Sequence, residues 1–297
     1  MNGNSPFLVQ IDFGLVAVSI LCLMPVVWVV VHIRRRFSSY RKRNRLPFKE
    51  LKRRPAGEYL RVKIEGLNEQ IDEQIYFMLG MPIGLALIIH LLKPSHPIAW
   101  LLAVIISCLW ALAFKSRLLK LLEERRNYQL GFDGERYVGE ELTRLIAFGY
   151  EIYHDVPFDG FNMDHVLVGK PGVFVVETKT RSKPVDESDE TKYEVEFDGK
   201  LLHWPWGREE QDIKQACNNA STLSKWLSSA TGQPVEVSPI LTFPGWWVDR
   251  TGRCEGVYIV NPEEIIQVCD SKKVKLDTPS IKRICHQLNQ KCRVEIK

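Results

Sequence analysis

The stretch DHVLVGKPGVFVVETK, residues 164–179, decides the fold that we expect for this chain of 297 residues. Two apolar runs flank a short loop, Gly-Lys-Pro-Gly at residues 169–172, so the stretch predicts two strands joined by a tight turn. If the loop is symmetric, Asp164 and Glu177 lie directly opposite each other, with Cβ atoms about 5 Å apart on one face. An asymmetric loop would shift the register by one residue and separate the two carboxylates.

Two opposed carboxylates repel each other, and a divalent cation would relieve the repulsion because hard cations bind carboxylate oxygens. Lys179 follows Glu177 by two positions, so its side chain should point to the same face of the strand. An ammonium group beside a metal ion can hold an attacking water or offset charge on a phosphate. The alternative is a strand that leaves the core here, with both residues simply solvated. Glu-x-Lys also occurs at residues 50–52, 190–192 and 295–297, where we expect no catalytic role.

The neighbouring segments predict an α/β domain with the order helix, three strands, helix, strand. Residues 131–134 should break a preceding helix, with Asp133 as the N-cap of a new one that ends at Gly149. One apolar stripe of that helix would contain Glu135, Val138, Leu142 and Leu145. Strands are expected at residues 151–156, 164–168, 173–180, 235–243 and 257–260, helices at 209–229 and 280–292, and a hairpin at 193–197 and 200–204 around a two-residue turn, Asp198-Gly199.

This series of motifs resembles the nuclease-related domain (NERD) family, which is similar to the PD-(D/E)XK nuclease superfamily. The resemblance covers about residues 131–229, roughly a third of the chain, and rests on Gly131-x-x-Gly134-Glu135, Asp164-His165, and the run that ends in Glu177-Thr-Lys179. It implies a restriction-endonuclease-like core in which Asp164 and Glu177 bind Mg²⁺ or Mn²⁺ and Lys179 assists the nucleophilic water. The proline that precedes the family's aspartate is absent, because Met163 stands there.

Two more residues match positions of the family. Glu135 matches its helix carboxylate and would be a further metal ligand or would orient one; an acid favoured by the helix dipole is the alternative. Gln215 matches a glutamine of the later helix, with a plain surface glutamine as the alternative. His165 should point away from Asp164, so we interpret it as structural. The predicted catalytic set is Asp164, Glu177, Lys179, Glu135 and Gln215, and the predicted metal ligands are Asp164, Glu177 and Glu135.

Aromatic and basic side chains near the predicted site have two interpretations each. Stacking on bases is possible for four tryptophans, whereas packing at the domain edge is the commoner role, for Trp204, Trp206, Trp246 and Trp247. Phosphate contacts or a solvated rim are the alternatives for Lys170, Arg181, Lys183 and Arg208.

Three long apolar runs precede the predicted domain, at residues 14–33, 75–92 and 97–114. Each approaches the roughly 20 residues that a helix needs to cross about 30 Å of hydrocarbon. Lys and Arg crowd the chain after the first and third runs, which marks the cytoplasmic side and predicts an N-terminus outside. A signal peptide is a weaker interpretation of the first run, because no basic segment precedes it and no cleavage site follows it.

Charge and cysteine content add little to this topology. Much of the net charge of +4 comes from residues 34–54, where a topology signal and attraction to anionic lipid are the simple explanation and nucleic-acid binding is the alternative. The seven cysteines show no metal-finger spacing, which indicates free thiols in a reducing compartment.

The sequence thus predicts an integral membrane protein of the bacterial inner (plasma) membrane with a cytoplasmic nuclease domain. The expected parts are an outward tail and first span (1–33), a basic cytoplasmic segment (34–74), a membrane hairpin (75–114), a helical linker (115–130) and the nuclease domain (131–297). The expected activity is Mg²⁺- or Mn²⁺-dependent hydrolysis of DNA, with RNA left open and entering foreign DNA as a candidate substrate. The lipid bilayer is the other expected partner, and oligomeric state is left open.

Two other functions compete with this prediction. The core would bind nucleic acid or a protein partner without cleaving it, as a membrane-tethered scaffold. Transport through the spans is the second, and it is poorly supported because only His32 and His90 are ionisable within them.

Overall fold

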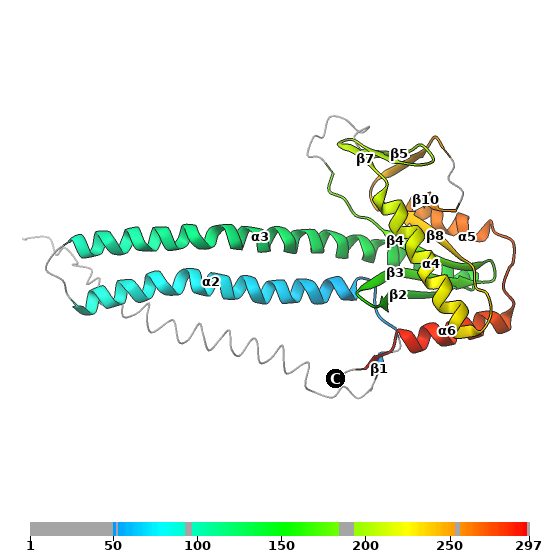
Figure 1. Ribbon diagram of the computed structural model, residues 1–297, viewed down its shortest axis with the longest axis horizontal. Helices are drawn as coiled ribbons and strands as arrows, with labels where there is room; N and C mark the ends of the chain where they lie inside the picture. The colour runs from blue at the N-terminus through cyan, green and yellow to red at the C-terminus, as the bar shows by residue number, and fades with distance from the viewer. Residues whose placement is uncertain (1–49, 52, 93–96, 184–192, 253–255, 296–297) are drawn as a thin grey trace, which may run out of the picture. The chain divides into compact units, whose positions relative to one another are not determined.

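The computed structural model describes residues 50–51, 53–92, 97–183, 193–252 and 256–295 (Figure 1). The first predicted span, residues 14–33, lies outside these residues. The chain divides into two compact units, one built on Gly66–Glu124 and the other on Phe48–Glu65 together with Arg125–Ile296. The second unit contains all the predicted site residues.

Two long helices, α2 (Glu58–Leu92) and α3 (Ile98–Leu142), contain the second and third predicted spans. Both are long and apolar enough to cross a membrane, and only 6% of each apolar window is buried. Within the first unit the Trp110 indole donates a hydrogen bond to the Phe77 carbonyl oxygen at 3.1 Å. The membrane property rests on length and composition, so the predicted topology stays a prediction.

A five-stranded sheet forms the centre of the second unit, in the order β10-β8-β4-β3-β2. Its strands are β2 (Glu151–Phe158), β3 (Phe161–Gly169), β4 (Gly172–Thr178), β8 (Val237–Thr242) and β10 (Tyr258–Val260). Strands β2, β3 and β4 are antiparallel, whereas β8 runs parallel to β4 and β10 parallel to β8. Every residue of β4 is buried, as expected for a strand covered on both faces. The predicted mixed α/β fold is therefore confirmed.

The loop between β3 and β4 is symmetric, as the prediction of opposed carboxylates required. Gly169 pairs with Gly172, and the ladder continues to the pair of His165 and Val176. Asp164 and Glu177 occupy the next position along the two strands. A one-residue slip would move Glu177 to the other face of the sheet, away from Asp164.

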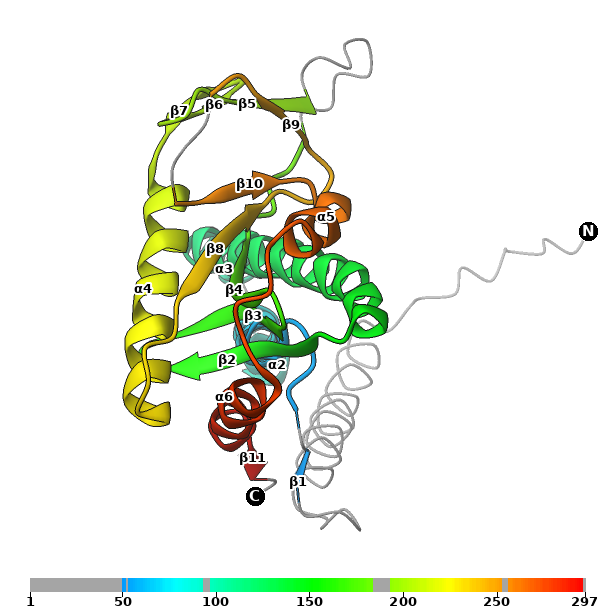
Figure 2. The same cartoon turned by 90° about the vertical axis from the view of Figure 1, so that its right-hand side faces the viewer.

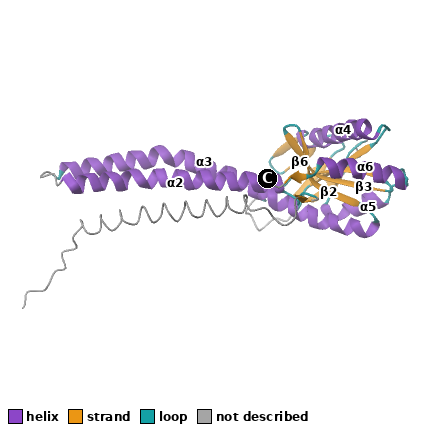
Figure 3. Cartoon of the chain, turned by 90° about the horizontal axis from the view of Figure 1, so that it is seen from below, coloured by secondary structure: helices purple, strands orange, loops and turns teal. Residues whose placement is uncertain are grey.

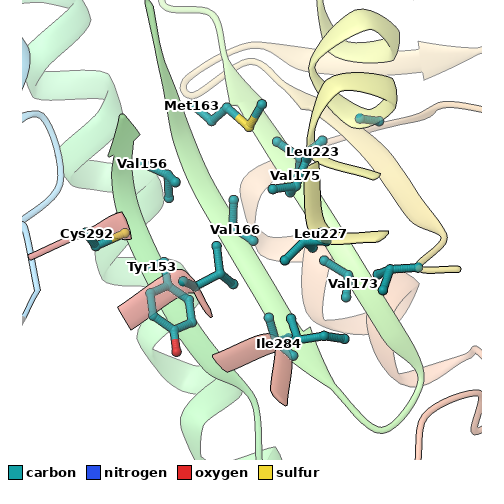
Figure 4. Packing of buried hydrophobic residues seen from close by; sticks show 14 residues of the cluster. Tyr153, Val156, Met163, Val166, Val173, Val175, Leu223, Leu227, Ile284 and Cys292 are labelled. Atoms are coloured by element: carbon teal, nitrogen blue, oxygen red, sulfur yellow. The ribbon is translucent and has the colours of Figure 1, made fainter. Parts of the chain in front are cut away.

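Helices cover both faces of the sheet (Figures 2 and 3). Alternate side chains of the strands contact α4 (Gln211–Thr231) and α6 (Thr278–Lys291) on one face, and this cluster includes Val166, Val175 and Leu223 (Figure 4). The other face packs on the end of α3, the 3₁₀ helix η1 (Thr143–Phe148) and α5 (Ile265–Asp270). The predicted stripe of Val138, Leu142 and Leu145 is buried there, and Gly149 ends the helical segment with φ 82°.

The predicted helix break at residues 131–134 is wrong, because α3 continues through it to Leu142. The glycines there allow close packing. A Cβ added at Gly134 would lie 1.7 Å from the Thr180 Oγ1, and one at Gly131 would lie 3.2 Å from the Leu60 Cδ1. Asp133, expected as an N-cap, lies mid-helix and accepts a hydrogen bond from the Gln129 side chain at 3.0 Å.

A smaller sheet has the order β7-β6-β5-β9 and its own buried cluster. Its strands are β5 (Glu194–Phe197), β6 (Leu202–Trp204), β7 (Gly207–Glu209) and β9 (Trp247–Arg250). The β5–β6 hairpin was predicted, but its two-residue turn was not correct: Phe197 pairs with Leu202, so four residues form the loop. The Asp198 carboxylate closes that loop by accepting the N–H groups of Lys200 and Leu201, each at 2.8 Å.

The remaining elements are short and were not predicted. They are the 3₁₀ helix η3 (Pro262–Glu264) and the antiparallel pair of β1 (Glu50–Leu51) with β11 (Val294–Glu295). All five cysteines in the described residues are free, as predicted.

Gly134→Ala should destabilise the fold although alanine is the better helix former. A Cβ there would also lie 2.8 Å from the Thr180 Cβ, so rotating the hydroxyl away cannot relieve the clash. The cost of such overpacking, about 1–3 kcal/mol, exceeds the gain in helix propensity of about 1 kcal/mol. Gly66→Ala on α2 is the control, because a Cβ there meets nothing within 4 Å. Thermal unfolding of both variants checks this prediction. Equal unfolding midpoints for Gly134→Ala and Gly66→Ala would contradict the packing role of Gly134.

Candidate acidic site at the ends of β3 and β4

Glu177 lies at the end of β4 with 3% of its surface exposed, and protein donors hold both of its carboxylate oxygens. The Gln215 side-chain amide donates to Oε1 at 2.6 Å, and the Asn219 amide donates to Oε2 at 2.7 Å. Both amides come from α4 and are one helical turn apart, so they face the strand together. These donors, with Lys179, give a buried carboxylate the partners that it needs.

Lys179 lies on the same face as Glu177, as predicted. Its Nζ is 3.0 Å from the Glu177 Oε1, donates to the Gln215 Oε1 at 2.9 Å, and lies 4.0 Å from the Asp212 Oδ1. Burial acts to lower the pKa of Lys179, but the Glu177 and Asp212 carboxylates outweigh it and the pKa is raised. Lys179 is therefore an ammonium ion at neutral pH.

Asp164 is half-buried beside Glu177 and accepts the backbone N–H of Thr178 through Oδ2 at 2.8 Å. Burial raises its pKa well above the usual range, and the negative charges of Glu177 and Glu135 raise it further. The pKa of Glu177 is also raised, mainly by burial, although Lys179 acts against the shift. The positive charge near the two carboxylates is therefore too small to offset the effect of burial on their pKa values.

Glu135 reaches the same site from α3, with 9% of its surface exposed. The backbone N–H of Gly57 donates to its carboxylate. Burial, followed by the negative charges of Asp155 and Glu177, raises the pKa of Glu135 to about 8. The tertiary structure thus brings all five predicted catalytic residues together, with three carboxylates and one ammonium group.

The donor set of this site suits a hard divalent cation in kind, because carboxylate oxygens with raised pKa values repel one another until a cation is shared. In the part of the chain that the structure describes, no group of three or more His, Cys, Asp or Glu side chains is arranged to hold a metal ion. Asp164, Glu177 and Glu135 thus have the kind of oxygen ligand that such an ion prefers, but their side chains are not arranged as a metal site, and both Glu177 oxygens accept hydrogen bonds from protein amides.

Three polar residues in and around the site were not predicted from the sequence. Asn219 was identifiable in principle, because it follows the predicted Gln215 by one turn on the same helix face. Asp212 is 5% exposed and lies between Lys179 and Arg181, whose Nη2 is 2.7 Å from its Oδ2. Asp155, on β2, is 2% exposed and is among the charges that act on Glu135.

A phosphate contact was one of the two interpretations of Arg181, but its guanidinium group already pairs with carboxylates. Nη2 pairs with the Glu209 Oε2 at 2.5 Å as well as with Asp212, and the group lies 4.9 Å from the centre of the Trp204 ring. The other candidates, Lys170, Lys183 and Arg208, are exposed.

His165 points away from Asp164, as predicted. It is fully buried, and its Nδ1 lies 2.8 Å from the Nδ1 of His154 on the neighbouring strand. Burial lowers the pKa of both imidazoles, so both rings are neutral. One Nδ1–H group therefore donates a hydrogen bond to the other Nδ1.

The four tryptophans divide into packing and exposed residues. Trp204 and Trp246 belong to the core of the small sheet, whereas Trp206 and Trp247 are 53% and 63% exposed. Trp247 lines an open cleft of about 800 Å³ together with Tyr137, Thr180 and Lys183. The cleft also has the acidic side chains Asp133, Glu194 and Glu263, so it disfavours a phosphate group.

Fold and site together define an α/β domain with an acidic, lysine-containing site at the end of β4, beside Asp164 of β3. Residues 130–244 match the protein family described as Nuclease-related domain (NERD). The match begins inside α3 and ends shortly after β8, so it contains Glu135, Asp164, Glu177, Lys179 and Gln215. Comparisons with curated proteins and with solved structures found no match. This part of the chain is thus similar to a nuclease-related domain.

The raised pKa of Glu135 predicts a pH-dependent stability when divalent cations are absent. Glu135 is protonated in the folded chain up to about pH 8, whereas the unfolded chain loses that proton near 4.5. The folded state binds more protons in this window, so the free energy of unfolding falls as pH rises through it. Glu135→Gln removes the titrating group and should match the wild type near pH 4.5 and exceed it by a few kcal/mol at pH 8.

Urea unfolding across this window measures the difference. Glu140→Gln is the control, because Glu140 is an exposed acid on the same helix. A gap between Glu135→Gln and the wild type that stays constant with pH would show that Glu135 does not carry the shift.

Proposed function

We propose that this chain is a metal-dependent nuclease that hydrolyses phosphodiester bonds in DNA. The observation that carries the proposal is the pairing of Lys179 with Glu177 at 3.0 Å inside a buried cluster with Asp164 and Glu135. A structural strand end would leave these groups solvated, whereas the structure buries Glu177 and Glu135 and half-buries Asp164 and Lys179. Burying several carboxylates together lowers the stability of the fold. Groups with perturbed pKa values are concentrated in active sites, where catalysis needs charge.

Each residue of the site has a distinct chemical role in this proposal. Asp164, Glu177 and Glu135 would hold Mg²⁺ or Mn²⁺, which when bound supplies an acidified water and polarises a phosphoryl oxygen. Lys179, which is charged at neutral pH, would hold the attacking water or stabilise charge that develops on the phosphate. Gln215 and Asn219 would fix the direction of the Glu177 carboxylate, and Gln215 would also hold the Lys179 ammonium.

The order of elements supports a restriction-endonuclease-like core of the PD-(D/E)XK type. Helix α3, strands β2 to β4, helix α4 and strand β8 follow the predicted order, with the strands β5 to β7 inserted before α4. Asp164 and Glu-x-Lys lie on adjacent antiparallel strands of this core.

The apolar helices support a membrane-anchored enzyme whose nuclease domain lies in the cytoplasm of a bacterial cell. The positive charges after residue 114 support a position of this domain on the inner side, because Lys and Arg are enriched in cytoplasmic segments beside membrane spans. An anchored nuclease meets DNA that reaches the membrane, such as entering foreign DNA. This cellular role fails if a version that lacks the three apolar runs but keeps residues 48–65 protects cells as well as the full chain does.

Cleavage of supercoiled plasmid by the full chain with Mn²⁺ or Mg²⁺ tests the activity. Asp164→Asn, Glu177→Gln and Lys179→Met should each reduce the rate by roughly 100-fold or more, since each removes a group that acts on the transition state. The matched controls are Lys214→Met and Glu236→Gln. Both side chains are exposed, and each forms an ion pair at the surface, Lys214 with Glu210 and Glu236 with Lys275. A well-folded chain that cleaves neither plasmid, single strands nor RNA would favour the scaffold instead.

Asn219→Ala should weaken Mn²⁺ binding although Asn219 is not a predicted ligand. Its amide holds the Glu177 Oε2 at 2.7 Å, and loss of such an outer partner typically costs about 10–100-fold in metal affinity or activity. The neighbouring Asn218→Ala is the control, because Asn218 is exposed on the same helix. Isothermal titration with Mn²⁺ measures the affinity of both variants. Equal affinities would show that Asn219 does not support metal binding.

A further inference from the structure

Asp155 extends the line of carboxylates to a third strand. Between β2 and β3, His154 pairs with His165 and Val156 pairs with Met163. Asp155 therefore stands at the position opposite Asp164, just as Asp164 stands at the position opposite Glu177. Among the non-glycine residues of the described ranges, Asp155 alone has a positive φ, 52°. A strained backbone of this kind persists where the surrounding structure needs it, often at functional sites.

The Asp155 carboxylate is committed to protein donors. Oδ2 accepts the backbone N–H of Tyr59 at 2.7 Å, and Oδ1 accepts the Asn162 side-chain amide at 2.8 Å. The Arg54 Nη1 lies 4.0 Å from Oδ2. Both oxygens are thus occupied and the side chain is 2% exposed, which suits a residue that fixes its neighbours rather than a metal ligand.

The start of α2 forms hydrogen bonds with a second carboxylate of the site, Glu135, as well as with Asp155. Tyr59 is in the first turn of α2, where backbone N–H groups have no partner within the helix, and Gly57 just before it donates to Glu135. The segment packs tightly on α3: a Cβ added at Gly57 would lie 2.7 Å from the Phe132 ring, and one at Gly139 would lie 2.8 Å from the Ala56 Cβ. Two carboxylates, from α3 and β2, are therefore held by one helix start.

We propose that Asp155 is a positioning residue of the acidic site, and that residues 53–59 complete this site by fixing Glu135 and Asp155 relative to each other. The inference rests on the proposed nuclease function. Residues 53–59 lie outside the segment 130–244 that matches the nuclease-related domain, but they belong to the same compact unit as that segment. The same helix α2 is one of the two that are long and apolar enough to cross a membrane.

The test compares three variants of the full chain. Asp155→Gly removes the carboxylate and accepts the positive φ without strain, so it separates positioning from backbone strain. Asp155→Asn tolerates the same φ and keeps one acceptor oxygen for Tyr59, so it should rescue part of the activity. Asp159→Asn is the control, because Asp159 is exposed in the turn that follows β2.

Two readouts are needed, plasmid cleavage and hydrogen exchange of the peptide that contains Tyr59. For Asp155→Gly we expect kcat to fall by about 10–100-fold at an unchanged KM for plasmid, as for loss of an outer partner of a metal site. The Tyr59 amide should lose its protection in the same variant, and Asp155→Asn should lie between it and the wild type in both readouts.

Each opposite result has a distinct meaning. Wild-type protection of Tyr59 in Asp155→Gly would show that the carboxylate does not hold the α2 start, which overturns the proposal. Lost protection with wild-type kcat would make the contact merely structural, which also overturns it. A wild-type chain that protects Tyr59 but cleaves nothing would overturn the proposed function, and the catalytic part of this inference with it.

Discussion

The structure of the second unit depends on placing one negative charge, that of Glu177, at the buried end of a strand. An unpaired carboxylate there would cost several kcal/mol, so donors must surround it. Helix α4 provides two of them one turn apart, and Lys179 provides the third from the strand itself. Leu223 and Leu227 pack the same helix against the sheet, so the apolar core fixes the distance at which the amides meet the carboxylate.

The surplus of negative charge in the site has a physical consequence. Burial raises the pKa values of Glu135, Asp164 and Glu177, the negative charges of neighbouring carboxylates raise each of them further, and a single lysine does not compensate these effects. A fold selected only for stability would replace such groups by apolar ones. A hard cation would remove both the repulsion and the stability cost, and in doing so would bring a polarised water beside Lys179.

The functional unit is larger than the segment similar to a nuclease-related domain. That segment begins at residue 130, in the middle of α3, whereas the compact unit also contains residues 48–65. Backbone N–H groups of Gly57 and Tyr59 reach Glu135 and Asp155 from outside the matched segment. A fragment cut at the matched boundaries would lack these donors, and two buried carboxylates would be left without them.

Strand periodicity and turn chemistry are local, so the β3–β4 pair and the shared face of Glu177 and Lys179 were predictable from the sequence alone. The symmetry of the loop between the two strands was left open by the sequence and is seen in the pairing of Gly169 with Gly172. The sequence by itself also determined the apolar stripe of α3 and the helix end at Gly149. Only the tertiary structure decided that α3 continues through Gly134, since the reason is the approach of Thr180, distant in sequence. The partners of the buried charges, among them Asp155 and Asn219, were likewise decided by which elements pack together, and hydrogen bonds between distant residues leave no periodic trace in the chain.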